Sequence, residues 1–303
     1  MQLTPLLRLA GITRLANITG LDCIGMPTVC AIRPAALTLS VAAGKGLSVE
    51  WAKVSAIMEA LEFFSAETTQ IPEFWCTTSQ VGAHRTMSLG DYAPCASNVP
   101  LSWTIGIDLI SGDSVLLPTD LVVLGRQTQS IKSFLSSSHG LAAGAVLVEA
   151  VLVGVLEVIE KHAVRAARNP ARVIPDYLNA LPLVGQLCQQ IEEAGAELAV
   201  YDCSFRLGIP VYFARVWDAR EPYAGVYSGS GAHLDPEIAV LRAITEAVQS
   251  RAVYIAGARD DLPSRAFEQH RAHASPSIID RLRRQPSTAT VDLAHAPSAT
   301  TQT

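Results

Sequence analysis

The chain has 303 residues, of which 49% are hydrophobic and 17% are charged, as is typical of a globular protein with one large core or two joined lobes. Its formal net charge is −5, and its 23 Lys and Arg residues provide no basic field for a nucleic-acid backbone. We therefore expect no nucleic-acid partner.

The cysteines and the first residues indicate a compartment. Six cysteines lie far apart without a CxxC pair, which is typical of neither a disulfide framework nor a zinc site. The opening residues MQLTPLLRLAGITRLA carry an arginine inside the apolar stretch and lack a small-residue cleavage site, so we expect no signal peptide. The prediction is a cytoplasmic protein with reduced thiols.

The first predicted elements are two short strands within residues 25–34 and 37–44. Both runs are rich in Val, Ile and Thr, and they end at a proline and a glycine. A helix is predicted to begin after Ser48, which is a suitable N-cap. Residues 69–140 mix turn residues with short apolar runs, and we expect strands and loops there.

A long helix is predicted over residues 143–168. Residues 141–159 are long enough to span a bilayer, but Glu149 and Glu157 interrupt the apolar run. Each ionisable group costs about 2.5 kcal/mol or more near the bilayer centre. We therefore expect no membrane partner and a buried helix of a large soluble core.

The second half of the chain continues with two strands, within residues 196–205 and 208–218. Asp235 and the proline that follows it mark the start of another helix, for which Gly257 is the expected stop. Because the strand runs are short and partly paired as in hairpins, they favour an α+β fold over a doubly wound parallel sheet.

Beyond residue 262 the composition shifts to Ser, Thr, Ala, Pro and Arg without sustained periodicity. We therefore predict one folded domain over residues 1–262 and a disordered tail over residues 263–303.

The predicted helices carry carboxylates on apolar surfaces. At about 100° per residue, Ser55, Glu59 and Glu62 fall within a stripe about 60° wide on a helix that is otherwise mostly apolar. Two buried carboxylates one turn apart cannot both stay ionised without a positive partner, because burial and like charge each disfavour the anion.

The same pattern occurs in two further helices. Glu149, Glu157 and Glu160 lie within about 80° of one another, and Glu246 and Gln249 share a stripe with an arginine. Mg²⁺ prefers oxygen ligands and often binds together with nucleotide phosphates. The alternative is that each stripe meets an arginine or solvent, since structural ion pairs also involve such carboxylates.

Other motifs give weaker signals. AAGKG around Lys45 lacks the spacing of a P-loop, and GSGAHL lacks the third glycine of a dinucleotide fingerprint, although both can supply N–H groups to phosphate. No paired zinc spacing is found among four histidines, His84, His139, His162 and His233.

Four stretches of the chain closely resemble the YcaO family, in order and at the expected intervals between about residues 11 and 262. They are GITRLANITGLDCIGMPTVCAIRP, LSVAAGKGLSVEWAKVSAIMEALEFFSAE, GLAAGAVLVEAVLVGVLEVIEKHAV and GSGAHLDPEIAVLRAITEAVQSRAVYIAGARDDL. The segments MEALEFFSAE, GIPVYFARVWD and AHLDPEIAVLRAITEAVQSR are most similar to the branch that works with TfuA-type partners.

The resemblance implies mixed sheets packed with long buried helices, and an ATP- and Mg²⁺-dependent enzyme that phosphorylates a backbone amide oxygen of a peptide or protein. An external sulfide would then give a thioamide, whereas a neighbouring Cys, Ser or Thr side chain would give an azoline ring. A TfuA-like partner and a homodimer are the implied assemblies.

The family's motifs fall on the three stripes. The resemblance assigns to nucleotide binding the residues Lys45, Ser55, Glu149, Lys161, Gln249 and Arg251. It assigns to Mg²⁺ the carboxylates of Glu59, Glu62, Glu157, Glu160 and Glu246.

The sequence also departs from the family pattern. Ala145 stands where the family usually has Asn, and Lys161 and His162 stand where Arg and Asp are usual. The chain is also short at both ends relative to the family. An alternative is therefore a degenerate protein that binds nucleotide or a partner without turnover.

Overall fold

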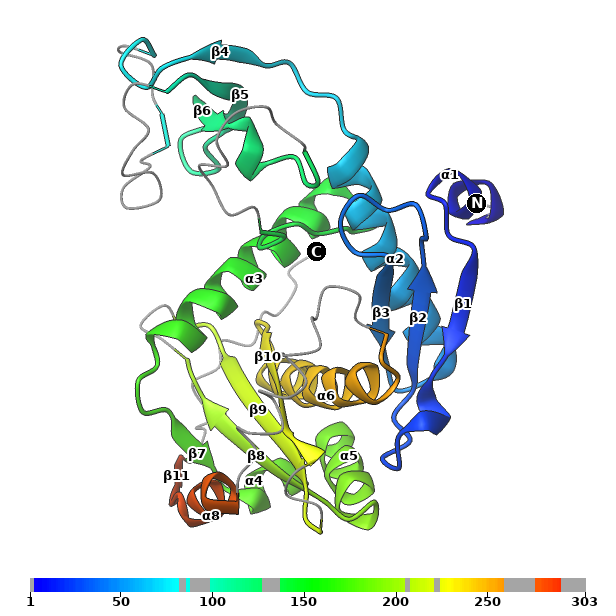
Figure 1. The fold of residues 1–303 in the computed structure, drawn as a ribbon. Coiled ribbons are helices and arrows are strands. Elements are labelled where there is room, and N and C mark those ends of the chain that lie inside the picture. Colours follow the sequence, from blue (N-terminus) through cyan, green and yellow to red (C-terminus); the bar gives the residue numbers. More distant parts are fainter. Residues whose placement is uncertain are drawn as a thin grey trace, which may run out of the picture.

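The structure, a computed structural model, describes residues 3–81, 86–87, 99–126, 137–204, 208–220, 224–258 and 276–289. His84 and Cys95 lie outside these residues. Within them, the strands form three sheets, and helices cover two of the sheets (Figure 1). This mixture of largely antiparallel sheets and long helices confirms the α+β prediction.

The first sheet follows the short helix α1 (Leu3–Leu9). It is antiparallel in the order β1–β2–β3, with strands Arg14–Asn17, Thr28–Ile32 and Val41–Lys45. Helix α2 (Val49–Thr68) packs on it and begins as predicted, because the Ser48 hydroxyl accepts the N–H of Trp51 at 3.2 Å. The helix lies very close to β3, since a Cβ at Gly44 would be 2.0 Å from the Ala56 nitrogen. Sheet and helix share a core of small residues.

The second sheet lies in the region predicted as strands and loops. It is antiparallel in the order β4–β5–β6, with strands Phe74–Cys76, Leu101–Ile107 and Ser114–Pro118. A small core beneath it contains Val81, Leu101, Trp103 and Leu116. This sheet projects away from the rest of the fold at the top of Figure 1.

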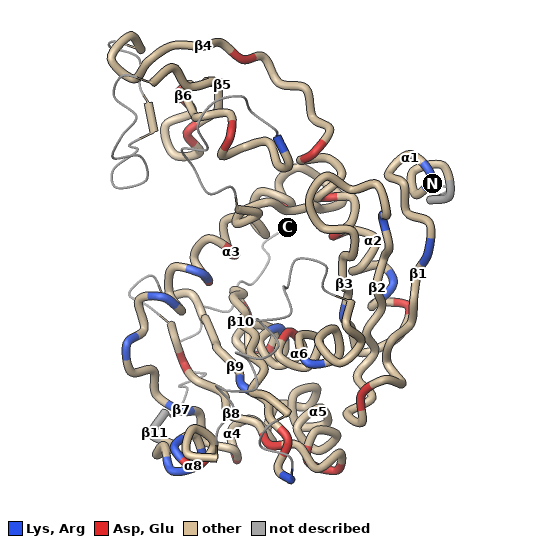
Figure 2. The backbone as a smooth tube through the Cα atoms, viewed as in Figure 1, with Lys and Arg blue, Asp and Glu red and all other residues tan. Residues whose placement is uncertain are grey.

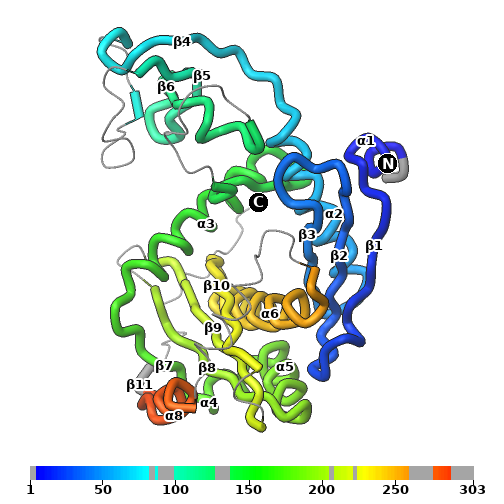
Figure 3. The backbone as a smooth tube through the Cα atoms, in the orientation of Figure 1, coloured from blue at the N-terminus to red at the C-terminus, as the bar shows by residue number. Residues whose placement is uncertain are grey.

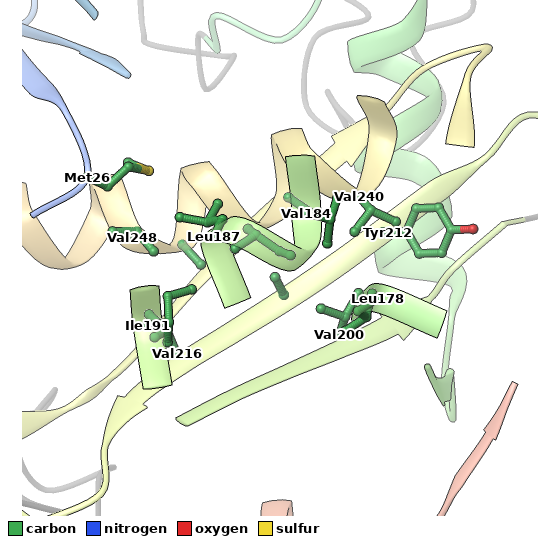
Figure 4. Packing of buried hydrophobic residues seen from close by; sticks show 14 of the residues in the cluster. Met26, Leu178, Val184, Leu187, Ile191, Val200, Tyr212, Val216, Val240 and Val248 are labelled. Carbon is green, nitrogen blue, oxygen red and sulfur yellow. The ribbon is translucent and has the colours of Figure 1, made fainter. Parts of the chain in front are cut away.

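The third sheet has the order β10–β9–β8–β7–β11 and is antiparallel except for the β7–β11 pair. Its strands in chain order are β7 (Ala171–Val173), β8 (Ala196–Asp202), β9 (Val211–Asp218), β10 (Val226–Ala232) and β11 (Ser287–Ala289). One face is covered by helices α4 (Pro175–Ala180), α5 (Pro182–Glu193) and α6 (Pro236–Ile255). Figure 4 shows the largest core, where Leu187, Val216 and Val248 meet between α5, the sheet and α6.

Helix α3 (Leu147–Ala166) is less buried than predicted. Leu156 and Ala163 pack on the third sheet, but Leu147 and Val148 are 79% and 77% exposed, and Leu152 and Val158 are also exposed. The prediction of a buried helix is therefore wrong for its outer face, because the described chain covers only one side. No helix in the described ranges is both long enough and apolar enough to cross a membrane.

The predicted disordered tail contains folded residues. Helix α8 (Pro276–Arg284) buries Ile279 and Leu282 against Tyr201 and Trp217, and β11 pairs with β7. The prediction is wrong for residues 276–289, because one short amphipathic helix gives too little periodicity to be recognised. Residues 263–275 and 290–303 lie outside the described part of the chain.

Candidate functional site

A cavity of about 1320 Å³ lies between β3, α2, α3, α6 and β10. The three helices can be followed around this region in Figure 3. Nine of the eleven predicted site residues line it: Lys45, Ser55, Glu59, Glu62, Glu157, Glu160, Lys161, Glu246 and Gln249. The three stripes predicted on separate helices therefore meet in one place.

Helix α2 presents its carboxylates to the cavity because its small residues face the other way. Ala52, Ala56 and Ala60 are fully buried against β2 and β3. Since i and i+4 positions share a face of a helix, this packing fixes the rotation of α2. Glu59 and Glu62 then lie on the cavity wall.

Helix α6 lies close to β10 because that strand is rich in glycine. A Cβ at Gly229 would be 2.3 Å from the Ala247 nitrogen, and a Cβ at Gly231 would be 2.3 Å from the Ala239 oxygen. These glycines, which the sequence suggested as phosphate-binding N–H groups, instead allow the helix to approach. The approach places Glu246 and Gln249 on the cavity wall.

Polar contacts join β3 to α6 across the cavity. The Lys45 ammonium donates to Gln249 Oε1 at 3.1 Å and lies 3.5 Å from Glu246 Oε2. Gln249 in turn donates through its side-chain nitrogen to the Ala43 carbonyl. This network joins β3 of the first sheet to α6, the helix that covers the third sheet.

Helix α3 contributes a second lysine and two different carboxylates. Glu160, 3% exposed, accepts from Lys161 Nζ at 2.8 Å, Ser230 Oγ at 2.7 Å and Ala232 N at 3.0 Å. Burial alone would raise the pKa of Glu160, but Lys161 and the hydroxyl donor lower it below its ordinary value. By contrast, burial raises the pKa of Glu157, which accepts only a backbone N–H in the described chain.

The two carboxylates of α2 lack sufficient compensating positive charge. Burial raises the pKa of Glu59 to about 7, with Lys45 opposing the shift and Glu62 and Glu246 adding to it. Burial likewise raises the pKa of Glu62 to about 7, although the Ala143 N–H donates to it at 2.8 Å. A cation placed beside them would favour both charged forms.

The donor set fits Mg²⁺ bound together with phosphate. Oxygen atoms predominate in the polar wall, and two lysines flank the carboxylates. Among the residues that the structure describes, no three carboxylate, His or Cys side chains already form a metal-binding group. Mg²⁺ commonly binds through protein carboxylates together with the phosphates of a nucleotide.

Two predicted residues do not reach this cavity. Arg251 is buried, with its Nε 3.0 Å from Asp22 Oδ1, so its predicted contact with phosphate is corrected to a structural ion pair. Glu149 is exposed in the first turn of α3 and accepts the Ala145 N–H at 2.7 Å. Ala145, the departure from the family pattern, is also exposed outside the cavity wall.

The sequence reasoning missed an apolar wall beside the carboxylates. It consists of Leu47, Trp51, Val54, Met58 and Phe63. Trp51 is 68% exposed, and it lies one turn before Ser55. The sequence did contain a signal for this wall, namely a large apolar side chain next to the polar stripe of α2. An apolar residue in that position can contact a ligand as well as a protein core.

The raised pKa values predict a pH dependence of stability in the absence of Mg²⁺ and nucleotide. Because both folded pKa values, about 7, lie above the unfolded value of 4.5, the folded chain binds these protons more tightly. The resulting stability is fully present below pH 4.5 and is lost as the pH rises through about 7. We expect the Tm to fall between about pH 5 and pH 8.

The Glu59→Gln/Glu62→Gln double variant is the control for this effect, since other groups titrate over the same range. Its Tm should fall less than that of the wild type in a thermal melt followed by circular dichroism. Equal pH profiles for the two proteins would contradict the assigned pKa shifts.

The α+β fold and the oxygen-rich, lysine-flanked cavity define a class, that of proteins that bind Mg²⁺ and a nucleotide together. The model of the family "YcaO cyclodehydratase, ATP- and Mg²⁺-binding" matches residues 43–301. The chain belongs to the YcaO family, and ATP and Mg²⁺ are confirmed as the cofactors of its domain. The match also extends well beyond the predicted domain end at residue 262.

The chain is similar over most of its length to a relative whose gene lies in a tfuA region. It is 35% identical over 297 residues to an uncharacterized protein in the tfuA 3′ region of Rhizobium leguminosarum bv. trifolii, covering 91% of this chain and 70% of the relative. This agrees with the resemblance to the TfuA-associated branch.

Two solved structures have a similar fold. A heterocyclase in complex with substrate and cofactor has a TM-score of 0.78 at 23% identity, and the match covers 94% of this chain. The chain spans only 43% of that heterocyclase. YcaO from Methanopyrus kandleri bound with AMPPCP and Mg²⁺ has a TM-score of 0.68 at 24% identity, covering 89% of this chain and 70% of the other.

Proposed function

We propose that the protein uses ATP and Mg²⁺ to activate a backbone amide of a ribosomally made peptide, and that the product is a thioamide formed with a TfuA-like partner. The observation that carries this proposal is the convergence of carboxylates from α2, α3 and α6 with two lysines in one cavity. Family membership and the relative's position in a tfuA region support it.

The residues divide into two groups in this proposal. Glu59, Glu62, Glu157, Glu160 and Glu246 would hold Mg²⁺, while Lys45, Ser55, Lys161 and Gln249 would contact the nucleotide. Bound ATP with Mg²⁺ supplies the phosphoryl group that converts the amide oxygen into a leaving group. The chain itself positions the peptide amide, and orientation of this kind accounts for much of the rate of phosphoryl transfer.

Lys45 and Lys161 are both restrained by polar partners, which suits them to bind phosphate. Glu160 and Glu246 both lie near Lys161, at 2.8 Å and 3.9 Å, and Gln249 fixes Lys45. An ammonium restrained in this way needs little reorganisation when phosphate charge develops. In the net reaction, an amide, hydrogen sulfide and ATP give a thioamide, ADP, phosphate and a proton.

The test is a reconstitution with ATP, Mg²⁺, a sulfide source, the TfuA-like partner and a candidate precursor peptide. We expect phosphate release that depends on the peptide, and a peptide mass increased by exchange of oxygen for sulfur. Loss of water from the peptide without sulfide would instead indicate azoline formation, which the family description as a cyclodehydratase favours as the second candidate. Nucleotide binding without phosphate release would indicate a non-catalytic protein.

A further inference from the structure

A second cavity, of about 960 Å³, lies on the face of the third sheet opposite α6. Tyr212 and Ala214 of β9 pack in the core under α6, whereas Phe213 and Arg215 line this cavity. Successive side chains of a strand point to opposite faces, so the sheet separates the two regions. The two cavities share no lining residue.

The charge of this cavity is strongly positive. Its charged lining residues are Arg168, Arg215, Arg281, Arg284 and Asp280. The single carboxylate already has a partner, because Asp280 Oδ1 lies 3.8 Å from Nη1 of Arg283, which is not in the lining. None of the four arginines forms an ion pair with another described residue. In a chain of net charge −5, this is a local concentration of arginines that lack an ion-pair partner in the described part of the chain. Figure 2 shows basic residues, in blue, gathered on α8.

Two aromatic rings pack against one of these arginines, Arg215. The Arg215 guanidinium carbon lies 5.2 Å from the Phe213 ring centroid and 5.7 Å from that of Tyr201. Contact with rings uses the face of a guanidinium and leaves its edge donors available for a planar, bidentate acceptor such as a carboxylate. Tyr201 is 2% exposed, and its hydroxyl has no hydrogen-bond partner among the described residues.

The distribution of the cations favours a ligand with several anionic groups. The arginines come from the segment after α3, from β9 and from α8, and apolar Val164, Pro170 and Leu282 lie among them. One small anion would neutralise only part of this charge and would leave the apolar wall uncovered. A peptide with several acidic side chains beside apolar ones matches both features.

We propose that this second cavity binds an acidic segment of the peptide substrate, at a distance from the amide that is modified. The assignment of that peptide as the substrate rests on the function proposed above. The site would hold the substrate by its Asp and Glu side chains and would leave the first cavity free for ATP. Because it is built partly by α8, it also gives the folded C-terminal segment a role.

The experiment measures fluorescence anisotropy of a labelled decapeptide of alternating Glu and Leu with the full chain and without ATP. The matched peptide has Gln in place of Glu. We expect binding of the Glu peptide only, weakened by salt. The Arg168→Gln/Arg281→Gln variant should bind at least about tenfold more weakly, since two charge-assisted contacts are lost. Arg165→Gln, an exposed arginine of α3 outside the lining, should bind as the wild type does.

Several results would overturn the assignment. These are equal binding of the Gln peptide, an equal loss in Arg165→Gln, or binding of inorganic pyrophosphate without binding of the Glu peptide. Titration of the same variants with ATP and Mg²⁺ separates this proposal from the previous one. If the Arg168→Gln/Arg281→Gln variant loses peptide binding and keeps its affinity for ATP, the two sites are independent. If the wild type binds the peptide and does not bind ATP, only the proposed nucleotide site is rejected.

Discussion

Replacing Glu62 by Gln is expected to weaken binding of ATP with Mg²⁺ by at least about tenfold, with the fold intact. The substitution keeps the shape of the side chain and an oxygen that can accept the Ala143 N–H, which lies 2.8 Å from Oε1. It removes a formal charge that would face the metal. Isothermal titration calorimetry at about pH 8 is the suitable measurement, because the pKa of about 7 then leaves the wild-type group ionised.

The control for this prediction is Glu50→Gln on the same helix. Glu50 is exposed in the first turn of α2 and does not line the cavity, so its loss should leave the affinity unchanged. Similar affinity in Glu62→Gln and the wild type would remove Glu62 from the metal site. A loss of stability without a loss of affinity would indicate an ordinary structural carboxylate.

Replacing Asp22 by Asn is expected to lower the free energy of unfolding by about 3 kcal/mol or more. Asp22 and Arg251 are 3% and 6% exposed in their side chains and form a 3.0 Å ion pair. Asn keeps the volume but leaves the Arg251 charge buried with only Asp218, 3.7 Å away, as a carboxylate partner in the described chain. Removing one member of a buried pair costs far more than the pair contributes in net terms.

Urea denaturation tests this second prediction, and Glu197→Gln provides the comparison. Glu197 pairs with Arg283 at the surface, where both side chains are about one third exposed or more, so its loss should cost at most about 1 kcal/mol. Below its melting temperature, Asp22→Asn should bind ATP as the wild type does. Equal stability losses in the two variants would contradict the structural role given to Arg251.

The elements that the sequence predicted are those with strong local signals. The N-cap residues of α2 and α6 are Ser48 and Asp235, whose side chains accept backbone N–H groups of the first helical turn. Strands β8 and β9 have long apolar runs. Strand β10 was missed because its sequence is rich in Gly and Ser, which disfavour strands. The strand needs those glycines because α6 packs very close to it. This contact joins distant parts of the chain, so a local sequence pattern cannot predict it.

Helices α4 and α5 were missed although a signal was present. Each begins with a proline at its first position, Pro175 and Pro182, which is a recognised helix start. For the site, helical spacing identified which carboxylates share a face, since that depends on local geometry alone. The partner of Arg251 lies 229 residues away along the chain, so local spacing could not separate an ion pair from a phosphate contact.

Carboxylates of α2, α3 and α6 are expected to hold a divalent ion and a nucleotide jointly. The most direct measurement is a crystal structure with Mn²⁺ and a non-hydrolysable ATP analogue, because Mn²⁺ accepts the oxygen ligands of Mg²⁺ and gives an anomalous signal. We expect manganese density inside the first cavity, in contact with carboxylates from at least two of the three helices. Nucleotide bound in the arginine-lined cavity, or bound in the first cavity without manganese at these carboxylates, would contradict this expectation.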